Sequence, residues 1–401
     1  MKSYISAWPK SAQLPDFPRS LVILGSTGSI GVSALKVVAK HPELFTVTAL
    51  AGGRNAARLA EQCARFRPPY AAVLDDAVRA EFLALLPDGY RPEVLTGPEG
   101  YAALAALPEA ELILSAIVGA AGFAPTLAAA RAGKMIGLAN KESLVLGGHV
   151  IRAACRESGA VILPVDSEHN ALFQGLCGHG EADEEISRLI LTASGGPFRG
   201  RDHAFLSTVT RAQALAHPNW SMGAKISVDS ATLMNKGLEI IEACHLYGLP
   251  VSRVDAVVHP QSIVHSLVEF VDGSQLAHLG TPDMQVPIAH CLCFPRRVTV
   301  DVKPLNLAAV GALTFEPPDP VAFPCLRLAR EAFDAGPSHA IALNAANEVA
   351  VAAFLEERIG YLDIPAAIEA ALDRHVPVDV STPEAILELD RAVRAEVLAA
   401  L

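Results

Sequence analysis

The stretch RSLVILGSTGSIGVSALKVVAKH, residues 19–41, decides the fold of the first part of this chain. The apolar run SLVIL predicts a buried strand, and VSALKVVAKH has the apolar spacing of a helix. Between them, Gly25, Gly28 and Gly31 predict a tight turn that lets the backbone approach a phosphate at the helix N-terminus. This order of strand, turn and helix is typical of a nucleotide-binding domain, although such a turn also occurs without a ligand.

Further apolar runs alternate with Ala- and Leu-rich segments of helical periodicity as the chain continues. Strands that are apolar throughout are buried on both faces, so the sequence predicts a Rossmann-like parallel sheet covered by helices. The runs are TVTALA (46–51), YAAVLD (70–75), ELILSA (111–116), KMIGLA (134–139) and AVILPVD (160–166). We expect this α/β domain to cover residues 19–166, after a disordered arm over residues 1–18.

The pattern changes after Asp166. SRLILTA (187–193) predicts another buried strand, whereas the runs on either side of Asp272 and Gly273 predict an antiparallel hairpin. Residues 167–293 should therefore form a central α/β domain with a mixed sheet. Prolines punctuate residues 294–323, which predicts a linker, and the helical periods of residues 324–401 predict a C-terminal helical bundle.

The composition excludes several classes of protein. The 401 residues are 51% hydrophobic and 19% charged, which is too apolar for a disordered chain. A net charge of −11 repels polyanions and argues against nucleic acid as a partner. No apolar run reaches the ~20 residues of a membrane span, so we expect no membrane partner. The seven cysteines are scattered without CxxC spacing, which favours buried thiols in a cytoplasmic protein.

The residues after the second expected strand indicate which dinucleotide binds. NAD-binding domains usually place a carboxylate here, against the ribose 2′-hydroxyl. This chain has Gly53, Arg54 and Asn55 instead, with an arginine and no carboxylate. Because arginine pairs well with a 2′-phosphate, the sequence predicts NADPH rather than NADH.

Two acidic segments predict a site for a hard metal ion. Asp166 and Glu168 end an expected strand, where residues two apart point the same way. Glu239 can supply a third carboxylate from a helix that Asp229 or Ser230 could cap. Three oxygen ligands without Cys or His suit Mg²⁺ or Mn²⁺ rather than zinc. Each residue alone is also consistent with a cap or a solvated surface group, so the hypothesis depends on their convergence.

A second set of residues predicts a site for a phosphorylated substrate. Ser194 precedes two glycines after an expected strand, a turn that can form an anion-binding nest or can be an ordinary glycine turn. Ser230, Asn235 and Lys236 add hydroxyl, amide and ammonium donors near a helix start. These groups could bind one oxyanion if the fold brings them together.

Three further features lie near these segments. Trp220, in the loop HPNWSMG (217–223), predicts a lid that excludes water, although such a residue can also pin its loop to the core. Lys141 follows a strand at the carboxyl edge of the parallel sheet, where ligands of such sheets bind. His259 and His265 fall in an apolar strand region and are interpreted as structural histidines.

Seven segments together resemble the 1-deoxy-D-xylulose 5-phosphate reductoisomerase family. The match runs in order over about residues 20–400, and the 27-residue segment 217–243 is highly specific. The segments are GSTGSIG (25–31), LANKESLV (138–145), LPVDSEHNA (163–171), SGGPF (194–198), HPNWSMGAKISVDSATLMNKGLEIIEA (217–243), HPQSIVHSLVEF (259–270) and ALNAANEVAV (342–351).

The resemblance implies an oxidoreductase that converts 1-deoxy-D-xylulose 5-phosphate and NADPH into 2-C-methyl-D-erythritol 4-phosphate, using Mg²⁺, Mn²⁺ or Co²⁺. This reaction belongs to the non-mevalonate (MEP) pathway of isopentenyl diphosphate biosynthesis. The partner is then a small phosphorylated sugar, the central domain is the catalytic one, and the protein is a homodimer.

The resemblance also implies roles for individual residues. The metal ligands are Asp166, Glu168 and Glu239, and together with Lys141 and His217 they form the catalytic set. The substrate-binding residues are Lys141, Ser167, Glu168, Ser194, His217, Ser230, Asn235, Lys236 and Glu239. The cofactor residues are Thr27, Gly28, Ser29, Ile30, Gly53, Arg54, Asn55, Asn140, Glu142 and Gly223, and Trp220 and Met222 match lid residues.

Two other interpretations compete with this one. A semialdehyde or homoserine-type dehydrogenase would share a nucleotide domain followed by a mixed sheet, but it would need a nucleophilic cysteine in a tight motif or an arginine pair. A nucleotide-sensing scaffold with a decayed site would have lost a metal carboxylate or Trp220, and both are present.

Overall fold

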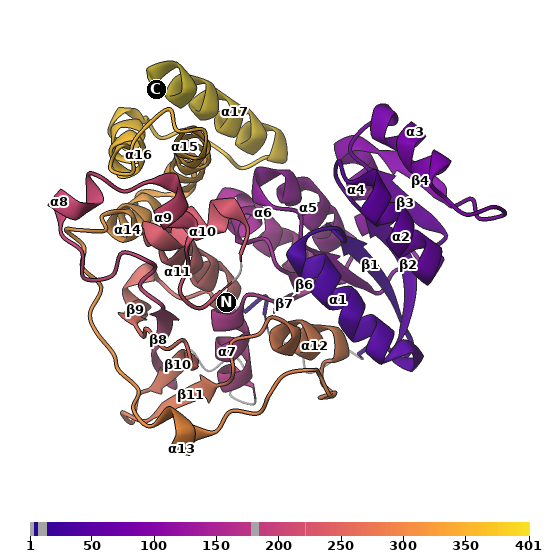
Figure 1. Ribbon diagram of the computed structural model, residues 1–401, viewed down its shortest axis with the longest axis horizontal. Helices are drawn as coiled ribbons and strands as arrows, with labels where there is room; N and C mark the ends of the chain where they lie inside the picture. Colours follow the sequence, from indigo (N-terminus) through magenta and orange to yellow (C-terminus); the bar gives the residue numbers. More distant parts are fainter. Residues whose placement is uncertain (1–3, 7–13, 178–183, 221) are drawn as a thin grey trace.

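Three groups of elements follow one another along the chain: a large sheet with its helices, a small sheet, and a helical C-terminal part (Figure 1). The computed structural model describes residues 4–6, 14–177, 184–220 and 222–401. The expected α/β fold class, with its C-terminal helical bundle, is confirmed.

The first sheet is parallel and has seven strands in the order β4-β3-β2-β1-β5-β6-β7. Its strands are β1 (Arg19–Leu24), β2 (Phe45–Ala51), β3 (Tyr70–Val73), β4 (Glu93–Thr96), β5 (Leu112–Ser115), β6 (Met135–Leu138) and β7 (Val161–Pro164). The connecting helices are α1 (Ser29–Lys40), α2 (Ala56–Phe66), α3 (Asp76–Ala84), α4 (Gly97–Ala105), α5 (Phe123–Arg131) and α6 (Lys141–Ser158). The apolar runs of the sequence correspond to these strands except β4, a partly exposed edge strand that has no such run.

The strand order reverses at β1, because the chain runs outward from β1 through β2 to β4 and then returns to the other side at β5. Ligands of such sheets bind beyond the carboxyl ends of the strands at this reversal point. The turn after β1 and the start of α6 both lie at that edge, so the fold places the glycine turn and Lys141 on one side of the sheet.

The second sheet has the order β11-β10-β8-β9 and is mixed. Strand β10 is antiparallel to both its neighbours, whereas β8 and β9 are parallel. The strands are β8 (Ile186–Ala193), β9 (Val254–Val258), β10 (Val264–Phe270) and β11 (Gln275–Leu279), and Asp272 and Gly273 lie in the turn of the predicted hairpin. The accompanying helices are α7 (Ser167–Leu176), α8 (His203–Leu206), α9 (Arg211–Leu215), α10 (Ala224–Ala231) and α11 (Met234–Tyr247).

Residues 294–323 form an extended connection with one short helix, α13 (Leu307–Val310), and Figure 1 shows it passing along the small sheet. The helix before it, α12 (Gln285–Cys293), packs on α1 of the first domain. The C-terminal helices are α14 (Cys325–Ala335), α15 (Pro337–Leu355), α16 (Asp363–Arg374) and α17 (Pro383–Ala400). Thr382 caps α17 and Pro383 lies in its first turn. Among the described residues, no helix is long and apolar enough to cross a bilayer.

The described part of the N-terminal arm is ordered, so the prediction of a disordered arm over residues 1–18 is wrong there. Ile5 is buried, its N–H donates to Leu246 O (3.0 Å), and its carbonyl accepts from Ile162 N (2.9 Å). Residue 5 therefore adds one hydrogen-bonded residue beside β7. The sequence pattern did not show this because so short a segment has no periodicity of its own.

Candidate active site

The turn between β1 and α1 brings backbone N–H groups to the edge of a cavity. An added Cβ at Gly31 would lie 2.4 Å from Gly25 O and from Ser26 Cα, so only glycine fits there. Gly28 is the N-cap of α1 and has no capping side chain, which leaves the first N–H groups of the helix for a ligand. Gly28, Ser29 and Ile30 line the cavity. The turn thus has the geometry for a pyrophosphate.

The neighbouring turn, after β2, carries the residues predicted to distinguish NADPH from NADH. Gly53, Arg54 and Asn55 are exposed, and Asn55 caps α2 by accepting from Arg58 N (3.0 Å). Arg58 Nη1 donates to Thr27 O (3.2 Å), which joins this turn to the first one. The side chain of Arg54 is exposed to solvent beside these two turns.

Three carboxylates converge where the two sheets meet. Asp166, Glu168 and Glu239 each offer an oxygen, and these oxygens lie within 4.8 Å of one another. Asp166 is the N-cap of α7, with Glu168 in the first turn of that helix, and Glu239 projects from α11. The predicted convergence is confirmed, but its stated cause is wrong: the capped helix start, and not an extended strand, brings Asp166 and Glu168 together.

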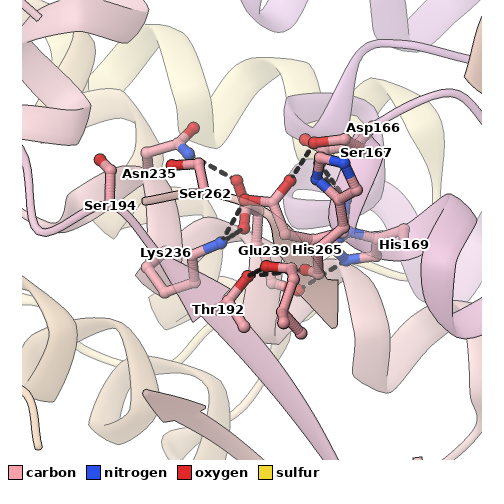
Figure 2. Close-up of polar contacts among 12 residues, drawn as sticks. Asp166, Ser167, His169, Thr192, Ser194, Asn235, Lys236, Glu239, Ser262 and His265 are labelled. Atoms are coloured by element: carbon pink, nitrogen blue, oxygen red, sulfur yellow. Dashed lines mark hydrogen bonds and ion pairs between the residues drawn. The ribbon is translucent and has the colours of Figure 1, made fainter. Parts of the chain in front are cut away.

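Two lysines balance most of this negative charge. Lys141 Nζ lies 2.6 Å from Asp166 Oδ2 and 2.8 Å from Glu239 Oε1, and it also donates to Asn235 Oδ1 (2.9 Å). Lys236 Nζ lies 2.8 Å from Glu168 Oε1 and contacts Glu239 as well. Figure 2 shows Asn235 and Lys236 turned towards Glu239. Two ammonium groups thus face three carboxylates.

The pKa values reflect this balance. Burial opposes the charge on Asp166, but Lys141 holds the pKa of that carboxyl well below its usual value. Burial and then the charge of Glu239 raise the pKa of Glu168 to about 7. Burial opposes the charge on Lys141 too, whereas Asp166 and Glu239 raise its pKa well above the usual value. The raised pKa of Glu168 shows that the cluster has an excess of negative charge. A further cation bound there would stabilise the charged form of this carboxyl.

The donor set fits a divalent ion of the hard class. All three candidate ligands are carboxylates, and their oxygens lie close enough to share one ion. The ammonium groups of Lys141 and Lys236 already occupy positions where cations are favoured. The residues present therefore suit Mg²⁺ or Mn²⁺ better than zinc.

A ring of donors lies beside the carboxylates. Ser194 Oγ lies 2.9 Å from His217 Nε2 and accepts from Gly196 N (3.2 Å). A Cβ at Gly196 would lie 2.7 Å from Ser230 O, so the glycine lets the turn after β8 approach the end of α10. Burial lowers the pKa of His217, which favours the neutral ring. The predicted phosphate donors Ser194, Ser230, Asn235 and Lys236 all line the same cavity.

Residues of the loop 216–223 on both sides of residue 221 line the cavity. Asn219 Nδ2 donates to Pro260 O (2.7 Å) and to Ser262 Oγ (2.9 Å), and Trp220 N donates to His217 Nδ1 (3.0 Å). The half-buried Trp220 lines the cavity together with Met222. This position agrees with a lid.

One cavity of about 670 Å³ connects these groups. Its lining includes all the predicted catalytic and substrate-binding residues, and five of the ten predicted cofactor residues. The former are Lys141, Asp166, Ser167, Glu168, Ser194, His217, Ser230, Asn235, Lys236 and Glu239, and the latter are Gly28, Ser29, Ile30, Glu142 and Gly223. Thr27, Gly53, Arg54 and Asn55 lie at the two turns beyond this lining, and Asn140 is buried as the N-cap of α6.

The structure corrects the predicted helix cap and one of the two histidine predictions. Asp229 and Ser230 do not cap the helix that carries Glu239: both lie inside α10, and Leu233 is the N-cap of α11. His259 is fully buried between Thr314 O (2.8 Å) and Ile263 N (3.1 Å), as a structural histidine should be. His265, by contrast, lines the cavity.

Sequence reasoning missed the placement of His265 because the register of β10 against β11 shifts between Val264 and Ser266. Strict alternation along the strand therefore fails at this residue. Sequence reasoning also missed His169. Its Nδ1 lies 3.8 Å from Asp166 Oδ1, and its Nε2 lies 3.6 Å from Glu242 Oε2. The i, i+3 spacing of Asp166 and His169 at a helix start was the available signal.

Three family models match the chain. The model described as 1-deoxy-D-xylulose 5-phosphate reductoisomerase matches residues 21–148. Two models of C-terminal domains of the same reductoisomerase match residues 162–247 and 279–396. Together they cover parts of the nucleotide-binding turn, the carboxylate cluster and the helical bundle.

Individual relatives and structures agree with the models. Proteins named 1-deoxy-D-xylulose 5-phosphate reductoisomerase from Oleidesulfovibrio alaskensis and Nitratidesulfovibrio vulgaris are 61% and 60% identical, over 98% and 99% of this chain and 97% of each relative. A crystal structure of DOX-P reductoisomerase with NADPH, fosmidomycin and magnesium has a TM-score of 0.90 at 43% identity, covering 95% of this chain and 98% of that one. The Zymomonas mobilis enzyme with NADPH has a TM-score of 0.89 at 42% identity, covering 96% and 99%.

Proposed function

Because the chain belongs to the 1-deoxy-D-xylulose 5-phosphate reductoisomerase family, we propose that the cavity between its two sheets is the site of that family's reaction. The protein is an oxidoreductase that converts 1-deoxy-D-xylulose 5-phosphate into 2-C-methyl-D-erythritol 4-phosphate with NADPH and Mg²⁺, in the MEP pathway of isopentenyl diphosphate biosynthesis.

One observation carries the assignment of the site. The glycine turn of the first sheet, the three carboxylates and the Ser194 turn of the second sheet all line a single cavity. A dinucleotide, a metal ion and a phosphorylated sugar can then lie within reach of one another. Holding the reactants in one orientation removes much of the entropic cost of a reaction between them.

We propose that Asp166, Glu168 and Glu239 hold the metal ion. A divalent ion bound there supplies Lewis-acid polarisation of the substrate's carbonyl and hydroxyl oxygens. Lys141, hydrogen-bonded to two of these carboxylates, is placed to donate to the same end of the substrate. Mn²⁺ and Co²⁺ prefer similar oxygen donors and should also support activity.

We propose that the substrate phosphate binds in the same cavity, between the Ser194 turn and the start of α11. The hydroxyls of Ser194 and Ser230 and the amide of Asn235 supply neutral donors, and Lys236 supplies a positive charge. Neutral His217, on Ser194, closes this region from the loop above. Gly28, Ser29 and Ile30 bind the NADPH pyrophosphate, while Arg54 binds the 2′-phosphate. Trp220 and Met222 cover the nicotinamide end and exclude water.

The chain division proposed from the sequence assigns a part to each task. Residues 19–166 bind NADPH, residues 167–293 bind metal and substrate, and a linker over residues 294–323 leads to the helical part, 324–401. We further propose a cytoplasmic location, since the described cysteines are all unpaired, as a reducing compartment would keep them.

We propose that the protein is a homodimer that pairs through the open edge of β11. This strand is hydrogen-bonded to β10 in its sheet, and Leu276 on it is 50% exposed. An edge strand with exposed leucines is a template for pairing with a second copy. Sedimentation equilibrium should give twice the mass of one chain. The substitution Leu276→Lys should lower this measured mass.

The function is tested by following NADPH absorbance with purified protein, 1-deoxy-D-xylulose 5-phosphate and Mn²⁺. Oxidation should require all three, should stop on addition of a chelator, and should be slower with NADH. A folded protein that binds NADPH but does not oxidise it with this substrate would contradict the assignment.

A further inference from the structure

Lys225, to which the proposed function assigns no role, lies just after the loop 216–223, here called the lid loop. Lys225 is in the first turn of α10, two residues after the loop 216–223 ends. The loop runs directly into this helix, since Gly223 O accepts from Ser227 N (3.1 Å) and from Ser227 Oγ (3.0 Å). Whatever holds Lys225 in place therefore also holds the end of the loop.

Lys225 is held by two buried carboxylates from different parts of the fold. Its Nζ lies 2.6 Å from Glu142 Oε1 in α6 and 2.8 Å from Asp229 Oδ2 in its own helix. The side chains of Glu142 and Asp229 are only 9% and 2% exposed. An ammonium group between two buried carboxylates is held far more firmly than a surface ion pair.

Each carboxylate is fixed in turn by an amide. Glu142 Oε2 accepts from Asn140 Nδ2 (3.1 Å), and Asp229 Oδ1 accepts from Asn347 Nδ2 (2.9 Å) in α15. The contacts thus run from the first turn of α6 through α10 to the C-terminal helical part, elements that lie together in Figure 1. The lid loop is anchored to both of the other parts of the molecule.

The local electrostatics favour Lys225 only because of these partners. A positive charge in the first turn of a helix is repelled by the helix dipole. Burial by itself would raise the pKa of Glu142, but the charge of Lys225 keeps that pKa below its usual value. Lys225 and Glu142 therefore stay charged and paired at neutral pH.

The first turn of α6 has two neighbouring charged residues with different partners. Lys141 points to the metal cluster through Asp166 and Glu239, whereas Glu142 points to Lys225. A single turn of helix thus supports both the cluster and the end of the lid loop. Both side chains project from backbone that is buried and helical.

We propose that Lys225 is a positioning residue that fastens the lid loop to the α6 turn carrying Lys141, so that His217 and Trp220 lie over the substrate when the cluster is assembled. The inference rests on the proposed function, because it concerns the lid of that site. Lys225 acts through Glu142 and the loop and contributes no group to the reaction.

The test uses Trp220 as its own reporter. The sequence contains two tryptophans, Trp8 and Trp220, so Trp8→Phe leaves Trp220 as the only one. In that background, Lys225→Met should increase acrylamide quenching of Trp220 fluorescence in the NADPH complex. It should lower kcat by about 10- to 100-fold, as misplaced catalytic groups do, with KM for NADPH changed less.

Two variants serve as comparisons. Lys225→Arg keeps the charge between the carboxylates and should recover much of kcat and of the Trp220 shielding. Lys36→Met removes an exposed lysine from α1 and should change neither. In a double-mutant cycle, Lys225→Met and Glu142→Gln should be less than additive, since each breaks the same pair.

Several results would overturn the proposal. Unchanged Trp220 quenching with a raised KM for the sugar phosphate alone would make Lys225 a substrate contact instead. Additive effects of Lys225→Met and Glu142→Gln would show that Lys225 does not act through its ion pair with Glu142. If circular dichroism shows that Lys225→Met does not fold, the near-isosteric Glu142→Gln decides: increased quenching in NADPH-free protein supports the proposal, and unchanged quenching refutes it. An inactive parent enzyme would refute the proposed function separately, because the quenching comparison needs no turnover.

Discussion

The glycine turn and the carboxylate cluster are both parts of one cavity, yet they are built in opposite ways. The turn consists of residues 25–31, and its shape depends on close packing among neighbours, since a Cβ added at Gly31 would lie 2.4 Å from Gly25 O. The cluster is assembled from three helix starts or faces, with Lys141, Asp166 and Glu239 up to 98 residues apart in sequence. The turn depends on the size of its residues, and the cluster depends on the balance of their charges.

This difference determines how each region should respond to substitution. At Gly31 in the turn, adding one carbon atom is a large change, because the surrounding backbone leaves no room for it. In the cluster, an isosteric change that only removes a charge is a large change, because the buried Glu239, the half-buried Asp166 and Glu168 and two ammonium groups depend on one another. The following experiments examine that contrast.

The largest effect is expected for Glu239→Gln. The substitution keeps the size of the side chain but removes a proposed metal ligand and the charge that both lysines share. Since loss of a group merely supporting a metal ligand costs 10- to 100-fold, loss of the ligand should lower kcat/KM by at least about 100-fold. NADPH oxidation measures the rate, and Mn²⁺ titration measures metal affinity. An unchanged rate with normal affinity would refute the ligand assignment.

A smaller loss is expected for Gly31→Ala, which tests the turn. The new Cβ would overlap the backbone of Gly25 and Ser26, so the free energy of unfolding should fall by about 1–3 kcal/mol. NADPH should bind about tenfold more weakly because the turn opens, a change of about 1.4 kcal/mol. Thermal unfolding and NADPH titration measure the two effects.

Gly28→Ala is the matched control within the same turn. Its Cβ would lie 3.4 Å from Gly25 O, an ordinary contact, so the protein should keep its stability. NADPH affinity should still fall, since the methyl group would project where the pyrophosphate approaches. Equal loss of stability in both variants would show that the turn is not limited by the space at Gly31.

Arg54→Asp should have a more selective effect. The exposed arginine is proposed to pair with the 2′-phosphate, so its replacement by a carboxylate should shift the ratio of kcat/KM for NADPH over NADH by about tenfold. Arg65→Asp, at the other end of α2, should leave the ratio unchanged. Retained NADPH selectivity in Arg54→Asp would contradict this assignment.

The smallest effect concerns the titration of His217. Burial lowers the pKa of this ring below the usual 6.5. Because the folded value lies below the unfolded one, the contribution to stability is present above pH 6.5 and is lost as the pH falls through the folded value. NMR titration of the ring should give a midpoint below 6.5, and a midpoint at or above it would contradict the burial argument.

Much of the site could be predicted because its parts carry local signals. A glycine turn after an apolar strand, a helix start with Asn140 before Lys141, and Glu239 one turn after Asn235 are all patterns of neighbouring residues. Two other features, one in the site and one in the N-terminal arm, had no such local signal. His265 enters the cavity through a register shift, and Ile5 pairs beside β7 through a single hydrogen-bonded residue.

By itself, the sequence determined the order of most strands and helices, the parallel and mixed sheets, the glycine turn and the chemical types of the site residues. These features follow from short-range periodicity and backbone sterics, which act between neighbours in the chain. Only the tertiary structure decided that Asp166 reaches Glu239, that Lys141 and Lys236 balance them, and that Lys225 joins the lid loop to α6. Such contacts join residues far apart in the chain, and their distances and charge balance exist only once the helices have packed together.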